Sequence, residues 1–192
     1  MEPDEDELIA RVRSGRMDPS TPLPNGQEPA RFAIRQLMPR LLRVLLDAGA
    51  NPTRTNACDQ PLLHQAIEMW ETGAHGWAAE AVPQMIDALL AAGARLDERG
   101  DNDFTPLHVA ALRSNEAICR QLMRAGADVM AVAEATDSEG GQTPGEVAES
   151  YNRRGVAAIL REALTPDQLE RRRRQKAEAR KAYLQSLRRG GP

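Results

Sequence analysis

Aromatic side chains are scarce in this sequence, at 3% or six rings in 192 residues. Because β-sandwiches and barrels depend on aromatic and β-branched residues, this scarcity argues against an all-β fold. The abundant residues are instead 30 alanines and 20 leucines, about a quarter of the chain, and both are strong helix formers. The composition therefore predicts an all-α protein packed from small and medium-sized side chains.

Cysteines and long apolar runs are also few. Cys58 and Cys119 are the two cysteines, with no C-x-x-C pair, which excludes a disulfide scaffold and fits a reducing compartment. No apolar run approaches the roughly 18 residues of a membrane-spanning helix. The first residues are acidic, whereas a signal peptide is basic and then apolar. We expect a soluble cytoplasmic protein with no membrane segment, unless it is exported by machinery that reads other signals.

Lysine is nearly absent as well, because 23 of the 25 basic residues are arginine. This bias fits GC-rich codon usage, and it also fits a preference for the bidentate guanidinium in recognition. The formal net charge is −3.

Three leucine-rich segments end in Gly-Ala, at Gly49, Gly93 and Gly126. The second and third of these glycines are 33 residues apart and the first and second are 44 apart, so the second copy holds an insertion of 11 residues. Such a period indicates stacked repeats, each too short to bury its own apolar faces.

The third copy contains Thr105–Ala111, TPLHVAA, which resembles the signature of the ankyrin repeat. In the same frame one column is alanine in all four copies: Ala33, Ala66, Ala110 and Ala148. The first three copies also have apolar residues at i, i+1, i+4 and i+5, as in Leu41, Leu42, Leu45 and Leu46, which places them on one helix face, and in the fourth copy Arg161 ends this stripe. The resemblance covers residues 26–164 and implies an all-α solenoid of helix-turn-helix units with short hairpin tips.

We divide the chain accordingly. Residues 1–25 are predicted to form a capping helix with an Asp4/Glu7 capping box, followed by a Pro-rich connector. The repeats are assigned to 26–58, 59–102, 103–140 and 141–164, and residues 165–192 to a basic C-terminal helix. The fourth copy departs from the family pattern at Gly145 and Glu146, as a solvent-facing cap would.

Motifs of catalysis are lacking: the sequence has no phosphate-binding loop, H-E-x-x-H or G-x-S-x-G. His64 and His108 fall on the histidine column of the repeat, whose role in the family is structural, and we interpret His75 as a solvated loop residue. We therefore expect no enzyme, catalytic residue, metal, cofactor or small-molecule substrate.

The resemblance implies partner binding through the hairpin tips and the exposed side of the inner helices. Of the candidates, Met69, Leu112, Phe104 and Tyr151 are expected to be exposed apolar residues, as interface cores favour. Trp70 and Trp77, in the insertion, are either a lid on the neighbouring repeat or binding anchors. The predicted partner-binding residues are Met69, Trp70, Trp77, Asp101, Asn102, Phe104, Leu112, Arg113 and Tyr151.

The tail from Thr165 carries nine basic and three acidic residues. It is either a solvated helix that folds back on the acidic body or a contact for phosphates or an acidic surface. The residues of that second interpretation are Arg171, Arg172, Arg173, Arg174 and Lys176.

These features favour a non-enzymatic module that captures a single protein partner: a toxin, an effector target or an enzyme. Similar small bacterial ankyrin proteins include immunity proteins and effectors. The alternative is association with nucleic acid or another polyanion through the arginine-rich tail.

Overall fold

A computed structural model describes residues 4–24, 26–53, 55, 60–72, 76, 78–113, 115–133 and 140–188. Within these residues the regular structure is helical, and the β-structure consists of two isolated antiparallel bridges, Thr55 with Pro61 and Ala133 with Gln142. The chain divides into two compact units, residues 1–98 and 99–192, which are described separately.

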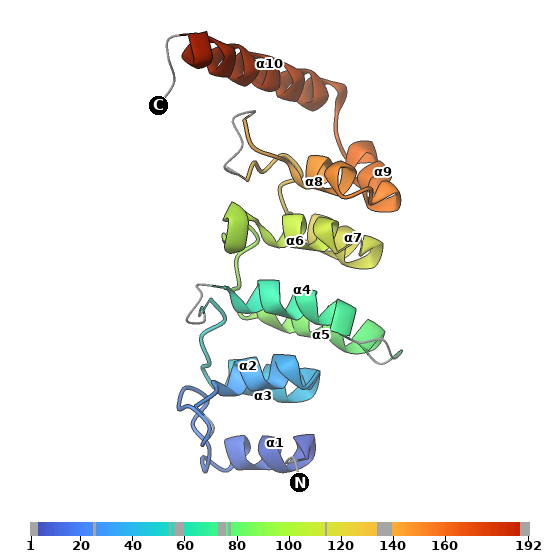
Figure 1. Cartoon of the computed structure of the whole chain (residues 1–192). Coiled ribbons are helices and arrows are strands. Elements are labelled where there is room, and N and C mark those ends of the chain that lie inside the picture. The colour runs from blue at the N-terminus through green and yellow to red at the C-terminus, as the bar shows by residue number, and fades with distance from the viewer. Residues whose placement is uncertain are drawn as a thin grey trace. The chain divides into compact units, whose positions relative to one another are not determined.

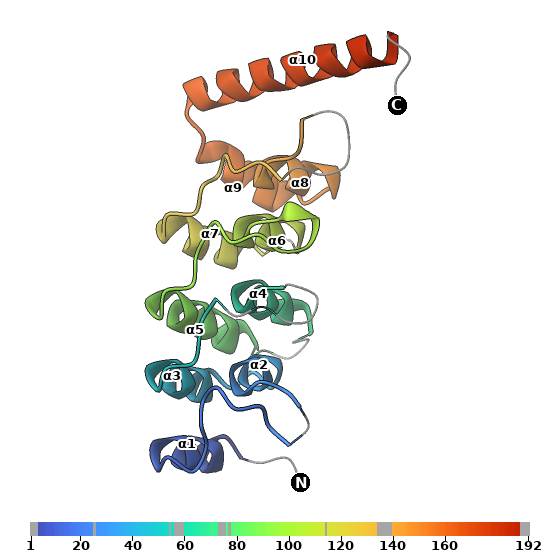
Figure 2. The ribbon, with the colours of Figure 1, turned by 90° about the vertical axis from the view of Figure 1, so that its left-hand side faces the viewer.

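The described residues of the first unit form five helices. They are α1 (Glu5–Arg13), α2 (Pro29–Arg35), α3 (Pro39–Asp47), α4 (Leu62–Thr72) and α5 (Ala78–Ala91). The pairs α2–α3 and α4–α5 stack on one another, and α1 lies on the end of the stack (Figure 1). Helices α1, α3 and α5 form one row and α2 and α4 form the other (Figure 2). We call these the outer and the inner row.

Helix α1 caps the end of the first unit. It buries Leu8, Ile9 and Val12. The predicted capping box is wrong, because the side chain of Asp4 makes no capping hydrogen bond. Instead Glu5 Oε1 accepts a hydrogen bond of 3.0 Å from the backbone N–H of Leu41. The acidic first turn of α1 therefore satisfies a free N–H at the start of α3, the end at which a helix favours a negative charge.

The insertion of the second copy lengthens both of its helices. Helix α4 has 11 residues and α5 has 14, whereas α2 and α6 have seven and α3 and α7 have nine. Pro83 lies 44 residues after Pro39, the first residue of α3, and so marks where α5 would begin without the insertion. The extra turn, residues 78–82, precedes this proline.

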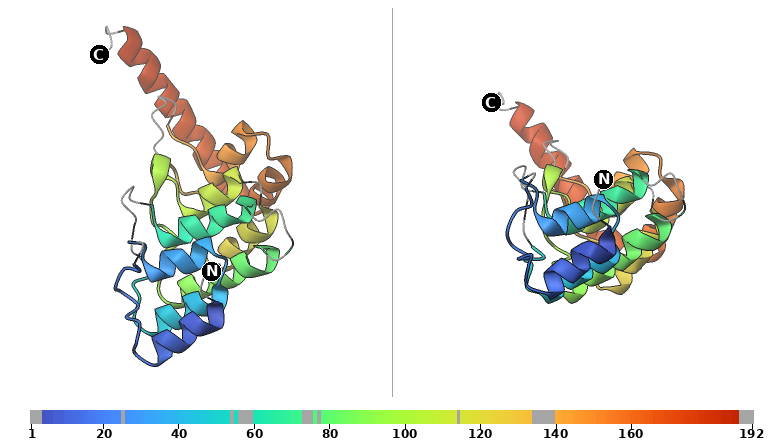
Figure 3. Two further views of the ribbon diagram at one scale, coloured as in Figure 1. Left: turned by 60° about the horizontal axis from the view of Figure 1, so that its bottom comes forward. Right: turned by 90° about the horizontal axis from the view of Figure 1, so that it is seen from below.

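The described residues of the second unit form a short 3-10 helix, two further helix pairs and a long terminal helix. They are the short 3-10 helix η1 (Asp101–Asp103), α6 (Pro106–Leu112), α7 (Glu116–Arg124), α8 (Pro144–Ser150), α9 (Arg154–Glu162) and α10 (Pro166–Arg188). Helix α6 contacts α8 in one row, which we call the inner row of this unit, and α7 contacts α9 in the other, which we call its outer row. Helix α10 crosses the end of this pair stack, and its last turns extend past α8 and α9 (Figure 3).

The core consists of the repeated apolar columns. The four column alanines are fully buried, and so are Leu41, Leu42 and Leu45 of α3. Such small side chains allow inner helices to pack closely. Gly49, Gly93 and Gly126 have φ values of +100°, +99° and +99° and close the outer helices, as predicted for the residue after a helix C-terminus. The Leu/Ala composition thus builds the core without help from most of the aromatic rings.

Candidate functional site

The ends of the inner helices of the second unit bring three predicted binding residues to one surface. Helices α6 and α8 contact one another. The first ends at Leu112, which Arg113 follows, and the second ends at Ser150, which Tyr151 follows. Tyr151 is 56% exposed, the highest value among the large apolar side chains that are described, while Leu112 and Arg113 are half-buried. We call Leu112, Arg113 and Tyr151 the inner-end surface.

Hydrogen bonds fix the backbone of the inner-end surface. The Nε of Arg153 donates to the carbonyl oxygen of Leu112 at 3.0 Å, which joins the end of α6 to the turn after α8. The Nε2 of Gln142 donates to Ser150 Oγ at 2.8 Å. Asn152 adopts a left-handed conformation with φ 55°, which asparagine tolerates better than most residues and which turns the chain sharply into α9. The exposed ring of Tyr151 is therefore presented from an ordered turn.

At the hairpin tip where the second copy meets the third, the candidate residues Asp101 and Asn102 are exposed. The expectation of an exposed Phe104 is wrong, since this ring is 8% exposed and stacks on the imidazole of His108 with centroids 5.3 Å apart. Phe104 directly precedes the N-cap residue Thr105, a position at which apolar side chains pack back onto the helix. It therefore stabilises the tip and presents no free aromatic surface.

Arg99 holds this tip in place. Its Nη1 donates to the carbonyl oxygen of Asp103 at 2.8 Å and to that of Val132 at 2.9 Å. This tip is thereby fastened to the connection that follows α7, so Asp101 and Asn102 lie on a loop that is held in place.

In the first unit, Met69 and Trp70 lie in the C-terminal half of α4 and are both half-buried, so the expectation of an exposed Met69, like that of an exposed Leu112, is met only in part. Trp77 and His75 lie outside the described residues. Whether Trp70 serves as a lid or as a binding anchor stays a prediction.

The predicted polyanion site of the tail is divided by the structure. Arg172 is 8% exposed, so the expectation of a solvent-facing cation at this position is wrong. Its Nη2 donates to Glu146 Oε2 at 2.7 Å and to the carbonyl oxygen of Gly141 at 2.7 Å, and its Nη1 donates to the carbonyl oxygen of Gly140 at 3.2 Å. Lys176 is half-buried with its Nζ 3.1 Å from Glu146 Oε1. These two cations bind α10 to the fourth copy.

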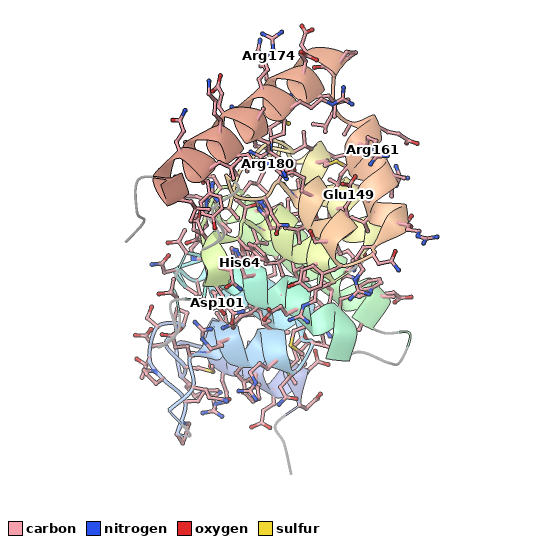
Figure 4. The ribbon with its side chains drawn as sticks, turned by 45° about the horizontal axis from the view of Figure 1, so that its top comes forward. His64, Asp101, Glu149, Arg161, Arg174 and Arg180 are labelled. Carbon is pink, nitrogen blue, oxygen red and sulfur yellow. The ribbon has the colours of Figure 1, made fainter. Side chains whose placement is uncertain are left out.

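The other three candidate cations of the tail remain at the surface. Arg174 points away from α8 and α9 (Figure 4) and pairs with Glu170 of its own helix at 3.2 Å. Arg171 and Arg173 are exposed. The surface that could bind a polyanion is thus smaller than the run of four arginines suggests.

The carboxylate of Glu146 is the electrostatic centre of this contact. Burial by itself raises its pKa, but hydrogen bonds from Arg172, from the backbone N–H of Thr143 and from Lys176 outweigh that effect and lower the pKa below its ordinary value of 4.5. Sequence reasoning missed the contact of Glu146 with α10. The signal for it was an acidic residue at the position where the second and third copies have His64 and His108.

A cavity of about 490 Å³ lies between α8, α9 and α10. It is lined in part by Leu164 and Leu169 and by two ion pairs, Arg172 with Glu146 and Arg161 with Glu149 (Figure 4). Helix α10 alone covers this end of the described part of the unit, whereas a further repeat would cover it with a pair of helices. The cavity is left because one helix fills less space than a pair.

The burial and the hydrogen bonds of His108 explain why this residue is structural. Its side chain is fully buried, its Nδ1 accepts a hydrogen bond of 3.2 Å from the N–H of Thr105, and its Nε2 lies 2.9 Å from the carbonyl oxygen of Gln142. Both ring nitrogens are therefore engaged in hydrogen bonds.

The described residues contain no cluster of three or more potential metal ligands. Among the same residues no helix is long and apolar enough to cross a membrane.

The repeat geometry agrees with a comparison against known families. A model of three ankyrin repeats matches residues 32–133, which is more than half of the chain and spans α2 to α7. The match stops before the fourth copy, where Gly145 and Glu146 depart from the pattern. Ankyrin repeats are generally protein–protein interaction modules and are typically non-catalytic. On its repeat sequence, its paired helices and this match, the chain belongs to the ankyrin-repeat family.

Proposed function

We propose that this protein is a non-enzymatic adaptor or immunity-type inhibitor that captures one protein partner in the cytoplasm. The observation that supports this best is the exposed ring of Tyr151, held beside Leu112 and Arg113 on a hydrogen-bonded turn. Asp101 and Asn102 lie in the same unit, at the hairpin tip that Arg99 holds in place, and supply polar contacts to the partner.

The chemistry of this surface fits a protein interface. Tyrosine and arginine are enriched among the residues that carry most of the binding energy, and they act best at the centre of a well-packed contact. A turn that is already ordered loses little further conformational freedom on binding, so more of the contact energy appears as affinity.

The proposal is tested by affinity purification from the source cell and by direct binding to the product of the neighbouring gene, since toxins and their inhibitors are made together. Tyr151→Ala and Arg113→Ala are each expected to weaken binding of the native partner by roughly tenfold or more. Arg120→Ala, an exposed residue of the outer helix α7, is the matched control and should bind as the wild type does. Full binding by both Tyr151→Ala and Arg113→Ala would exclude this surface.

The tryptophans of the insertion provide a separate anchor in the same proposal. Met69 and Trp70 lie near the end of α4, and Trp77 follows in the sequence. Trp70→Ala and Trp77→Ala are expected to weaken partner binding if these rings act as anchors. If they act as a lid, the same changes lower thermal stability and leave the affinity of the folded protein unchanged.

The alternative function, association with nucleic acid or another polyanion, retains one supporting observation. Arg171 and Arg173 are exposed on α10, followed by the exposed Arg180 and Lys181. Binding to a labelled DNA duplex should then weaken steeply with salt and be lost in the Arg171→Ala, Arg173→Ala double variant. Duplex binding that is unchanged in that variant would exclude the tail as the contact.

A further inference from the structure

A groove on the outer row of the first unit is lined by three arginines. It has a volume of about 400 Å³ and lies between α1, α3 and α5. Arg13 enters from the last turn of α1, while Arg40 and Arg43, three residues apart, enter from α3. Ile9, Pro39 and Val44 supply an apolar wall. The groove belongs to the outer row, whereas the candidate residues Met69 and Trp70 belong to the inner helix α4.

The positive charge of this groove is only partly compensated. Arg40 pairs with Asp6 of α1, with its Nη2 2.8 Å from Asp6 Oδ1. Arg13 and Arg43 have no carboxylate partner among the described residues, and no Asp or Glu lines the cavity. Two guanidinium groups therefore remain uncompensated in this groove, although the net charge of the whole chain is −3. Like charges that converge on one cavity repel one another, and a bound anion would relieve that repulsion.

The larger cavity under α10 differs in this respect. Two of its three guanidinium groups pair with carboxylates in its own wall, Arg172 with Glu146 and Arg161 with Glu149. Its charges are mostly satisfied within the protein. The groove between α1 and α3 is therefore the better candidate for an external anion.

We propose that this groove binds a phosphate monoester with an attached apolar group. Three guanidinium groups against the one carboxylate of Asp6 leave two positive charges, and a phosphate monoester carries about −1.5 to −2 at neutral pH. A carboxylate, with one negative charge, would leave one guanidinium group uncompensated. Arginine binds phosphate oxygens with two parallel hydrogen bonds, and Ile9, Pro39 and Val44 would cover the apolar group. The volume lies within the range of small-molecule pockets, roughly 300–1,000 Å³.

This chemistry has two sources, a free phosphate ester or a phosphorylated side chain of a protein partner. The inference does not depend on the partner-binding surface proposed above, because the groove lies in the first unit and the inner-end surface in the second. Phenyl phosphate is the simplest probe with both a dianionic and an apolar part. Inorganic phosphate, benzoate and a peptide containing phosphotyrosine complete the set.

The test combines calorimetry with amide chemical shifts on the full-length protein. We expect saturable binding of phenyl phosphate that is tighter than that of inorganic phosphate and of benzoate and that weakens with added salt. Shift changes are expected on α1 and α3. A phosphotyrosine peptide that binds more than about tenfold tighter than phenyl phosphate would identify a phosphoprotein as the source, and equal affinities would favour a free ester.

Variants locate the site. Arg13→Ala and Arg43→Ala should each weaken phenyl phosphate binding by about tenfold, as expected for loss of a charge-assisted bidentate contact. Arg11→Ala, on an exposed position of α1 that does not line the groove, is the matched control and should bind normally. Arg13 and Arg43 are exposed, so the fold should persist, and circular dichroism verifies this. The proposal is overturned by absence of saturable binding, by equal losses in the Arg11→Ala control, or by shift changes that map to Arg171 and Arg173 of α10.

Discussion

Arg172 of α10 donates a hydrogen bond of 2.7 Å to Glu146 of α8. Glu146 occupies the same position in the fourth repeat that His108 occupies in the third. His108 ties its own helix start at Thr105 to the backbone of the next copy at Gln142. Glu146 likewise caps its own helix start, accepting from the N–H of Thr143 at 2.8 Å, but its outward partner is a guanidinium group. A change of one side chain on this column thus replaces a link between repeats with a link to the terminal helix.

Loss of Arg172 should release α10 from the fourth copy. Arg172→Ala leaves the carboxylate of Glu146 and the carbonyl groups of Gly140 and Gly141 without their main donor in a largely buried setting. Removing one partner of a fully buried ion pair costs roughly 3–5 kcal/mol, and because these two side chains are 10% and 20% exposed we expect a cost near the lower end of that range. We expect a lower unfolding midpoint and faster hydrogen exchange in α10, measured by denaturation and by mass spectrometry.

Arg174→Ala is the control for that experiment. Arg174 is exposed and its ion pair among the described residues is with Glu170 of its own helix, so its removal should cost less than about 1 kcal/mol. Equal effects of the two substitutions would mean that the contact of Arg172 with Glu146 contributes little to holding α10.

The same contact predicts a loss of stability in acid. The pKa of Glu146 is lower in the folded protein than its ordinary value of 4.5, so the contribution of this carboxylate is fully present above pH 4.5. It is lost as the pH falls through the lowered folded value. Thermal midpoints of wild type and Glu146→Gln should therefore converge as the pH is lowered below 4.5. A constant difference between them across this range would contradict the assignment.

The sequence was sufficient to predict the repeats because their constraints are local and periodic. The alanine column, the leucine stripes and the glycine after α3, α5 and α7 recur in the same frame from copy to copy, and they lie in the fold where that frame places them. Each reports a requirement of helix packing or helix termination that a single residue type meets.

The errors have a different origin, namely contacts between segments. The tip position of Phe104 predicts an exposed ring, but the ring packs on His108. Arg172 was grouped with its neighbours in the arginine run, although helical periodicity turns only some of them toward α8. Asp4 matched a capping pattern, while Glu5 caps a different helix, 36 residues away in the sequence. Such pairings depend on tertiary geometry that one sequence does not contain.

His108→Ala should destabilise the second unit. The substitution removes hydrogen bonds to Thr105 and to the carbonyl oxygen of Gln142, opens a cavity at a fully buried position and takes away the partner of the Phe104 ring. Buried losses of this kind amount to roughly 2–4 kcal/mol. Chemical denaturation followed by circular dichroism measures the change, and a loss below about 1 kcal/mol would argue against this residue as a link between copies.

Gly141→Ala should also be destabilising, for a backbone reason. Gly141 has φ +66°, and an added Cβ would lie 2.3 Å from the carbonyl oxygen of Ala133. That oxygen belongs to the antiparallel bridge in which Ala133 and Gln142 exchange two hydrogen bonds, so the bridge must open to make room. We expect a lower thermal midpoint and faster exchange of the Gln142 amide. Gly126→Ala, with a positive φ but no atom within 4 Å of the added Cβ, separates the conformational cost from the clash.

Cys119 should be unreactive in the folded protein. Its side chain is fully buried on α7, and this burial, followed by the nearby negative charge of Glu116, raises the pKa of the thiol to about 12. Only the thiolate attacks alkylating reagents, and it is both rare at neutral pH and shielded from solvent. In a Cys58→Ser background, iodoacetamide labelling followed by mass spectrometry should show modification of Cys119 only after unfolding in guanidinium chloride. Because labelling of Cys119 then requires opening of α7, the labelling rate under native conditions measures the stability of the second unit. The labelling rate should rise in the Arg172→Ala variant only if release of α10 loosens the helices beneath it. Rapid labelling of the native wild type would show that α7 is not packed as described.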